Sequence, residues 1–75
     1  MKTTKKKIKL IVEKTKTGFS AYSEEYPVFT TGSSIAQLTE NALEACNLYF
    51  EDQGILVSVD NLKFEIDFQQ FFQYY

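Results

Sequence analysis

The side chains that carry out most acid–base, nucleophilic and metal chemistry are scarce in this chain of 75 residues. It has no histidine, arginine or tryptophan, which removes the commonest general base and metal ligand and the guanidinium that clamps phosphates. The only cysteine, Cys46, falls on the apolar stripe of a predicted helix, where a thiol has a raised pKa and is unreactive. Glu40 and Glu44 share a helical face, but without a third ligand such a pair is more typical of a solvated surface than of a metal site. The sequence therefore predicts no enzyme activity, no catalytic residue, no metal and no cofactor.

Charge is divided unevenly along the chain. Residues 1–16 carry seven of the eight lysines and a net charge of +6, whereas residues 17–75 carry a net charge of −8. An acidic body repels nucleic acid and attracts basic proteins. We therefore predict a basic protein partner, with acids that only maintain solubility as an equal alternative.

Two tyrosines, Tyr22 and Tyr26, lie off the inward-facing pattern of their strands and close to adjacent acids. Tyrosines often anchor protein interfaces, although covering a sheet edge is an equally good interpretation. The predicted partner-binding residues are Tyr22, Glu24, Glu25, Tyr26, Glu40 and Glu44.

Alternation of apolar and polar side chains predicts four strands. The first three cover residues 7–13, 19–24 and 28–31, and the short turn between the first two makes them an antiparallel hairpin. The fourth begins at Leu62 and alternates as far as Phe68. Pro27, at the head of the third strand, is typical of an edge or a strand start.

Helical periodicity between the third and fourth strands predicts one long helix over residues 35–52. Ser34 is its expected N-cap, Gln37 the capping-box partner of Ser34, and Gly54 the stop signal. The apolar stripe expected to cover the sheet consists of Ile35, Leu38, Ala42, Leu43, Ala45, Cys46, Tyr49 and Phe50. The predicted fold class is thus α+β, in the order β-β-β-α-β, with an antiparallel sheet covered on one face by the helix.

Residues 1–75 are expected to form a single domain in which residues 1–6 are a basic, flexible arm. After the last strand, a short C-terminal helical turn is predicted to place Phe68, Phe71, Phe72 and Tyr75 on one face. Because the core of so small a domain is marginal, we predict that these aromatic residues are oligomer contacts of a homodimer or higher oligomer. Residues 68–75 are also expected to begin a connection to a C-terminal DNA-binding domain.

The expected location is the cytoplasm. A single cysteine allows no internal disulfide, which fits a reducing compartment. The basic N-terminus lacks the apolar run and cleavage site of a signal peptide, and no apolar run approaches membrane-spanning length. No membrane partner is therefore predicted.

The order of motifs from Ile8 to Asp52 resembles the N-terminal domain of HicB-type antitoxins. The features are a strand of the form Ile-x-Leu-Ile-Val-Glu at residues 8–13, the run Gly-Phe-Ser-Ala-Tyr at residues 18–22, an acid before Pro27, a Thr-Thr-Gly strand end at Gly32, and an Asn-Ala-x-Glu-Ala helix around Glu44. These motifs cover well over half of the chain.

The resemblance implies a partial ribonuclease-H-like fold without the carboxylates of the nuclease. It implies an antitoxin that binds and neutralises a small basic ribonuclease (HicA-type) toxin of a toxin–antitoxin system, with DNA bound only through a C-terminal domain absent from this chain. Two alternatives stay open: an oligomerisation or ligand-sensing module of a transcriptional regulator, and a small enzyme of remnant nuclease fold. The absent histidine and the unclustered acids argue against the enzyme.

Overall fold

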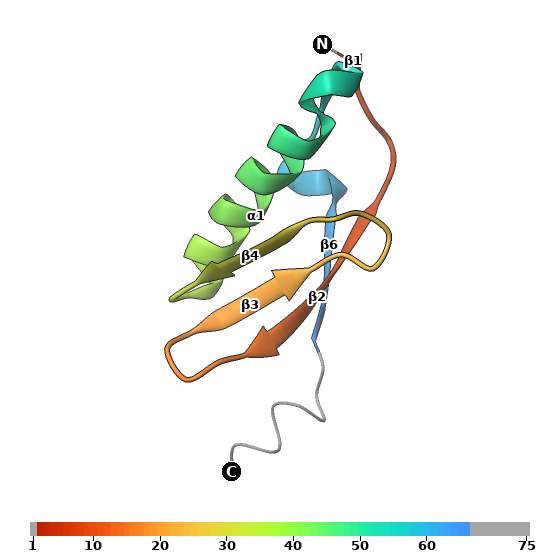
Figure 1. Cartoon of the computed structure of the whole chain (residues 1–75). Helices are drawn as coiled ribbons and strands as arrows, with labels where there is room; N and C mark the ends of the chain where they lie inside the picture. The colour runs from red at the N-terminus through yellow and green to blue at the C-terminus, as the bar shows by residue number, and fades with distance from the viewer. Residues whose placement is uncertain (1, 67–75) are drawn as a thin grey trace.

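The computed structural model describes residues 2–66 as one sheet-and-helix unit of the α+β class (Figure 1). In chain order the elements are β1 (Lys2–Thr3), β2 (Ile8–Lys14), β3 (Phe19–Tyr22), β4 (Phe29–Gly32), α1 (Ile35–Phe50), the 3-10 turn η1 (Glu51–Gln53), β5 (Ile55–Leu56), the 3-10 turn η2 (Val59–Asn61) and β6 (Leu62–Ile66). The predicted C-terminal turn, with Phe68, Phe71, Phe72 and Tyr75, lies outside the described residues.

The main sheet has four strands in the order β4-β3-β2-β6 and is mixed. Strands β2, β3 and β4 are antiparallel neighbours, whereas β6 runs parallel to β2 with Ile8 opposite Leu62. The prediction of an antiparallel sheet is therefore wrong for the last strand. After two antiparallel steps β4 points the same way as β2, and α1 then returns the chain to the end where β2 begins. A strand that follows such a helical crossover runs parallel to its neighbour.

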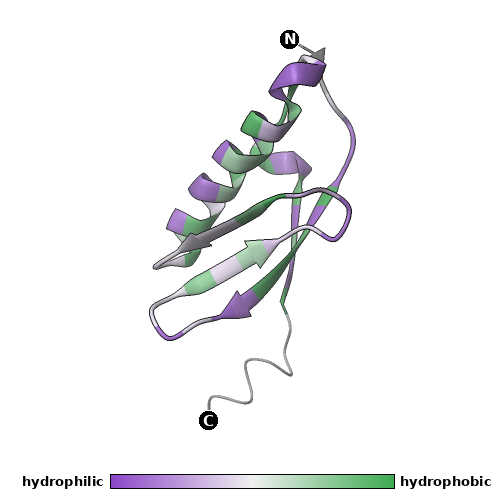
Figure 2. Ribbon diagram, viewed as in Figure 1, coloured by the Kyte–Doolittle hydropathy of each residue, from purple (hydrophilic) through white to green (hydrophobic). Residues whose placement is uncertain are grey.

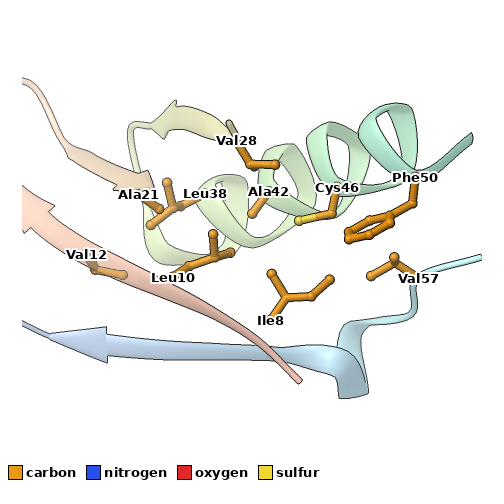
Figure 3. Close-up of a cluster of buried hydrophobic side chains, with 10 residues drawn as sticks. All are labelled: Ile8, Leu10, Val12, Ala21, Val28, Leu38, Ala42, Cys46, Phe50 and Val57. Carbon is orange, nitrogen blue, oxygen red and sulfur yellow. The ribbon is translucent and has the colours of Figure 1, made fainter. Parts of the chain in front are cut away.

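The core lies between α1 and one face of the sheet, as predicted (Figures 1 and 3). Strand β2 contributes every second side chain, and α1 contributes every fourth. The buried hydrophobic residues are Ile8, Leu10, Val12, Ala21, Val28, Leu38, Ala42, Cys46, Phe50 and Val57. Figure 2 shows the result as hydrophobic and hydrophilic bands that alternate along α1.

Two residues of the predicted stripe do not belong to this core. Ile35 is 52% exposed and Tyr49 is 36% exposed. The buried helix positions recur every four residues through Leu38 and Phe50, and Ile35 and Tyr49 each lie one position away from that series. The prediction was therefore correct for Leu38, Ala42, Cys46 and Phe50 and wrong for Ile35 and Tyr49.

The helix begins where the sequence predicts, because the Ser34 side chain accepts a hydrogen bond from the Gln37 backbone nitrogen at 3.1 Å. The reciprocal bond is displaced by one residue, since Gln37 Oε1 accepts from the backbone nitrogen of Ser33 at 2.7 Å. The helix ends at Phe50, two residues early, and Gly54 terminates η1 with a φ of 67°. Within residues 2–66, no helix is long and apolar enough to cross a membrane.

Residues 1–6 are predicted from the sequence to be a flexible arm, but this segment contains a short strand. Lys2–Thr3 form β1, which pairs in parallel with β5. Asn61 holds the following residues, because its side-chain nitrogen donates to the Thr4 carbonyl at 2.8 Å and to the Lys6 carbonyl at 3.1 Å. Its oxygen accepts from the Ser58 backbone nitrogen at 2.8 Å. This buried asparagine thus joins the N-terminal segment to η2 at the start of β6.

Candidate partner-binding surface

The six predicted partner-binding residues lie on two sides of the molecule. Glu40 and Glu44 are exposed on the outer surface of α1. Tyr22 lies on β3 opposite Ile11, and therefore on the sheet face that α1 does not cover. Glu24, Glu25 and Tyr26 form the turn between β3 and β4. The structure therefore brings together Glu40 with Glu44, and separates this pair from Tyr22.

The surface around Glu40 and Glu44 is an open hollow of about 420 Å³ between α1, η1 and β5, which we call the helix groove. Three leucines line it, with glutamates and one asparagine beside them. The lining residues are Glu40, Leu43, Glu44, Asn47, Leu48, Glu51 and Leu56. The surface that lines it is mainly apolar.

Apolar surface and negative charge coincide in the helix groove. Leu48 is 64% exposed and Leu56 is 43% exposed, which is unusual for leucines that could have joined a core. Residues 35–53, from the start of α1 to the end of η1, contain four acids and no base. The groove therefore combines an apolar centre with a negative electrostatic potential.

Asn47 lines the helix groove and connects α1 to the backbone of Val57. Its side-chain nitrogen donates to the Val57 carbonyl at 2.9 Å, and its oxygen accepts from the Val57 backbone nitrogen at 2.7 Å. A third bond runs from the same nitrogen to the Leu43 carbonyl at 3.1 Å. The amide thus pairs with Val57 as a strand backbone would, and fixes neighbouring Leu56 beside the helix. No pattern in the sequence indicates this role of Asn47.

A second, smaller hollow of about 240 Å³ lies on the other side of the same helix ridge. It is lined by Thr30 of β4 and by Asn41, Glu44, Ala45 and Leu48 of α1. Glu44 and Leu48 belong to both hollows. These two side chains therefore form a ridge between the two hollows.

The turn that carries Glu24, Glu25 and Tyr26 is tied to the rest of the molecule. Ser23 Oγ accepts from the backbone nitrogens of Glu25 and Tyr26, each at 3.1 Å. Glu24 lies 3.8 Å from the Lys9 ammonium. Glu25 is exposed, and its charge contributes to the raised pKa of Lys6.

Tyr26 is half-buried and belongs to an aromatic cluster. Its ring centroid lies 5.7 Å from that of Tyr49 and 5.1 Å from that of Phe50. The Lys6 ammonium lies over the Tyr26 ring, 5.1 Å from its centroid, and Tyr26 is the main cause of a raised pKa at Lys6. The Tyr26 hydroxyl is buried and makes no hydrogen bond within residues 2–66. Tyr26 therefore packs the turn onto the end of α1.

Cys46 and Ser34, whose side chains could in principle act as nucleophiles, have structural roles. Cys46 is fully buried in the core, and burial raises the pKa of its thiol. Ser34 caps α1. Among residues 2–66, no three or more cysteine or acidic side chains are grouped so that they could hold a metal ion.

Comparison with known proteins found no matching family model, no similar curated protein and no similar solved structure.

Proposed function

We propose that this chain is an antitoxin-like domain that binds and neutralises a small basic ribonuclease toxin of the HicA type, and that the helix groove is its contact surface. The observation that carries the proposal is the coincidence of exposed Leu48 and Leu56 with Glu40, Glu44 and Glu51 in one hollow. The ordered motifs between Ile8 and Asp52 that resemble HicB-type antitoxins support the same function.

The chemistry of the groove fits a surface that normally binds RNA. Such a surface is basic, so carboxylates on the rim attract it and accelerate encounter. The leucines in the centre supply the apolar burial that slows dissociation, because hot spots concentrate in desolvated centres with polar rims. An antitoxin bound in this way also places negative charge where RNA phosphates would bind, and so excludes the substrate.

The direct test is co-expression of the chain with the protein encoded by the neighbouring reading frame, which the proposal expects to be small and basic. We expect the two proteins to co-purify, and the chain to restore growth to cells in which the neighbouring protein alone is toxic. Binding by the purified proteins is then measured at increasing salt. The association rate should fall as salt rises, because steering between exposed charges is screened.

Two charge-reversal variants locate the surface. The double variant Glu40→Lys/Glu44→Lys is expected to slow association by roughly tenfold or more at low salt, because it inverts the rim of the groove. The matched control Glu24→Lys/Glu25→Lys changes net charge equally but acts on the distant turn, so its effect should be smaller. Equal loss of binding in both variants would show that only net charge matters. If the unaltered chain does not bind the toxin, the proposed function is refuted.

A further inference from the structure

The sheet face turned away from α1 is the second surface with an organised pattern. Ile8, Leu10 and Val12 of β2 are buried against α1, so the alternate residues Lys9 and Ile11 point to the opposite face. No other helix or strand in residues 2–66 covers that face (Figure 1). We call it the open sheet face.

A row of apolar side chains crosses this face at one level. Phe29 of β4 lies opposite Tyr22 of β3, and Tyr22 lies opposite Ile11 of β2. Residues directly opposite each other on neighbouring strands point to the same face, with Cβ atoms about 5 Å apart. Phe29 is 66% exposed, the largest exposed fraction among the large hydrophobic side chains within residues 2–66. The row therefore places apolar side chains next to one another on three strands and ends at Glu65 of β6.

Opposite charges flank the row at equal distances. Lys9 and Glu13 lie on the same face of β2, two residues before and two residues after Ile11. The Lys9 ammonium lies 3.4 Å from Glu65 and 3.8 Å from Glu24, and its side chain remains 44% exposed. The open sheet face therefore carries both signs of charge, unlike the helix groove, which carries only acids.

We propose that the open sheet face binds the same face of a second copy of this chain. In this dimer the two sheets are stacked, and the two-fold axis lies midway between them, parallel to the Phe29–Tyr22–Ile11 row. Rotation about this axis places each residue of the row over the same residue of the other copy. The same rotation exchanges the positions before and after Ile11, so that Lys9 of each copy faces Glu13 of the other. The Lys9–Glu13 pattern is thus complementary to itself, which is what an isologous two-fold interface requires. Glu65, which lies opposite Ile11 at the β6 end of the row, faces its own counterpart, and the Lys9 ammonium 3.4 Å away offsets part of that repulsion. Two sheets packed face to face stand about 10 Å apart, a distance that aromatic side chains fill.

A second copy fits this face better than the basic partner of the helix groove. Lys9 would repel a basic protein, and its two acid neighbours Glu24 and Glu65 are already within ion-pair distance of it. The proposal is independent of the proposed function, because the two surfaces lie on opposite sides of the sheet-and-helix unit. It assigns the contact to described residues of the sheet and not to the aromatic residues after Asp67.

The test is the molecular mass of the full chain in sedimentation experiments over a wide concentration range. We expect a monomer–dimer equilibrium in which Phe29→Ser raises the dissociation constant at least tenfold. Leu48→Ser is the matched control, because Leu48 is equally exposed at 64% but lies in the helix groove. It should leave the dimer unchanged.

The charge pair gives a second, more specific test. Glu13→Lys and Lys9→Glu should each weaken the dimer several-fold, because each brings like charges together twice. The double variant Lys9→Glu/Glu13→Lys should restore part of the lost affinity, since the reciprocal pairs are rebuilt with the signs exchanged. Restoration is incomplete because the new carboxylate lies beside Glu24 and Glu65. Circular dichroism of each variant checks that it is folded.

Three results would overturn the proposal. A chain that stays monomeric at every concentration has no such interface. A dimer that survives Phe29→Ser, or a charge exchange that restores none of the lost affinity, places the contact elsewhere. A dimer weakened by Phe71→Ser/Phe72→Ser and not by Phe29→Ser assigns it to the C-terminal segment.

Discussion

Replacing Asn47 by alanine should destabilise the domain far more than its half-exposed position on a helix would indicate. The change removes both hydrogen bonds to the Val57 backbone, at 2.7 and 2.9 Å, and Val57 is 2% exposed. Each bond contributes about 1 kcal/mol, and a buried backbone group left unpaired costs a further 1–3 kcal/mol. Because water reaches part of this site, we expect a total loss of about 2–4 kcal/mol. That is a large share of the roughly 4–11 kcal/mol available to a chain of this length.

The matched control is Asn41→Ala. Asn41 lies on the same helix and makes one side-chain bond, to the Thr31 carbonyl at 2.8 Å, so its loss should cost about 1 kcal/mol. Both substitutions replace asparagine by alanine within α1, so the gain in helix propensity cancels in the comparison. Urea unfolding followed by circular dichroism measures both. At a slope of about 1 kcal/mol per molar urea, the midpoint for Asn47→Ala should lie about 1–3 M below that for Asn41→Ala.

Equal midpoints for the two variants would refute this reasoning, since the Val57 backbone would then satisfy its hydrogen bonds in another way. Asn47→Asp gives an internal check. It keeps the acceptor for the Val57 nitrogen and loses the donor to the Val57 carbonyl, so its midpoint should lie between those of wild type and Asn47→Ala.

Two further predictions concern the core. Leu38→Ala should lower the free energy of unfolding by about 2–5 kcal/mol, because Leu38 is 1% exposed, whereas Leu48→Ala should change it by less than about 0.5 kcal/mol in urea titrations. Burial raises the pKa of the Cys46 thiol, so the unfolded chain releases this proton first as pH rises. The contribution of the neutral thiol is complete below the unfolded pKa of about 8.5 and is lost above it. Stability should therefore fall more steeply between pH 8 and 10 in wild type than in Cys46→Ala, and parallel curves would contradict the prediction.

Local pattern predicted the elements well but could not supply the direction of the last strand. Alternation located a strand that begins at Leu62, and two of its apolar residues, Leu62 and Phe64, pack against the core. A period of two is the same for parallel and antiparallel strands, so the direction of β6 depends on the crossover made by α1. That information lies in the connection from Gly32 to Leu62 and not in the strand itself.

The two asparagines that organise the molecule were overlooked for a related reason. A polar residue on the outer side of a helical pattern is normally solvated, so periodicity gives Asn47 no structural role. Its role depends on Val57, ten residues later, in a segment without a periodic pattern. Asn61 likewise joins backbone groups more than fifty residues away. The spacing of Glu40 and Glu44 did indicate a shared surface, but the exposed leucines of the helix groove had no periodic signal.

The two proposed interfaces together fix a stoichiometry. The open sheet face and the helix groove lie on opposite sides of the sheet-and-helix unit, so a dimer formed through the sheets leaves both grooves pointing outward. Each groove can then bind one toxin molecule without contact between the two toxins. We therefore expect a complex of two chains and two toxins, measured as a single mass by light scattering. In the Phe29→Ser variant the same experiment should give one chain and one toxin with unchanged affinity per groove. A loss of toxin binding in that variant would instead show that the sheet face and the groove are one functional surface.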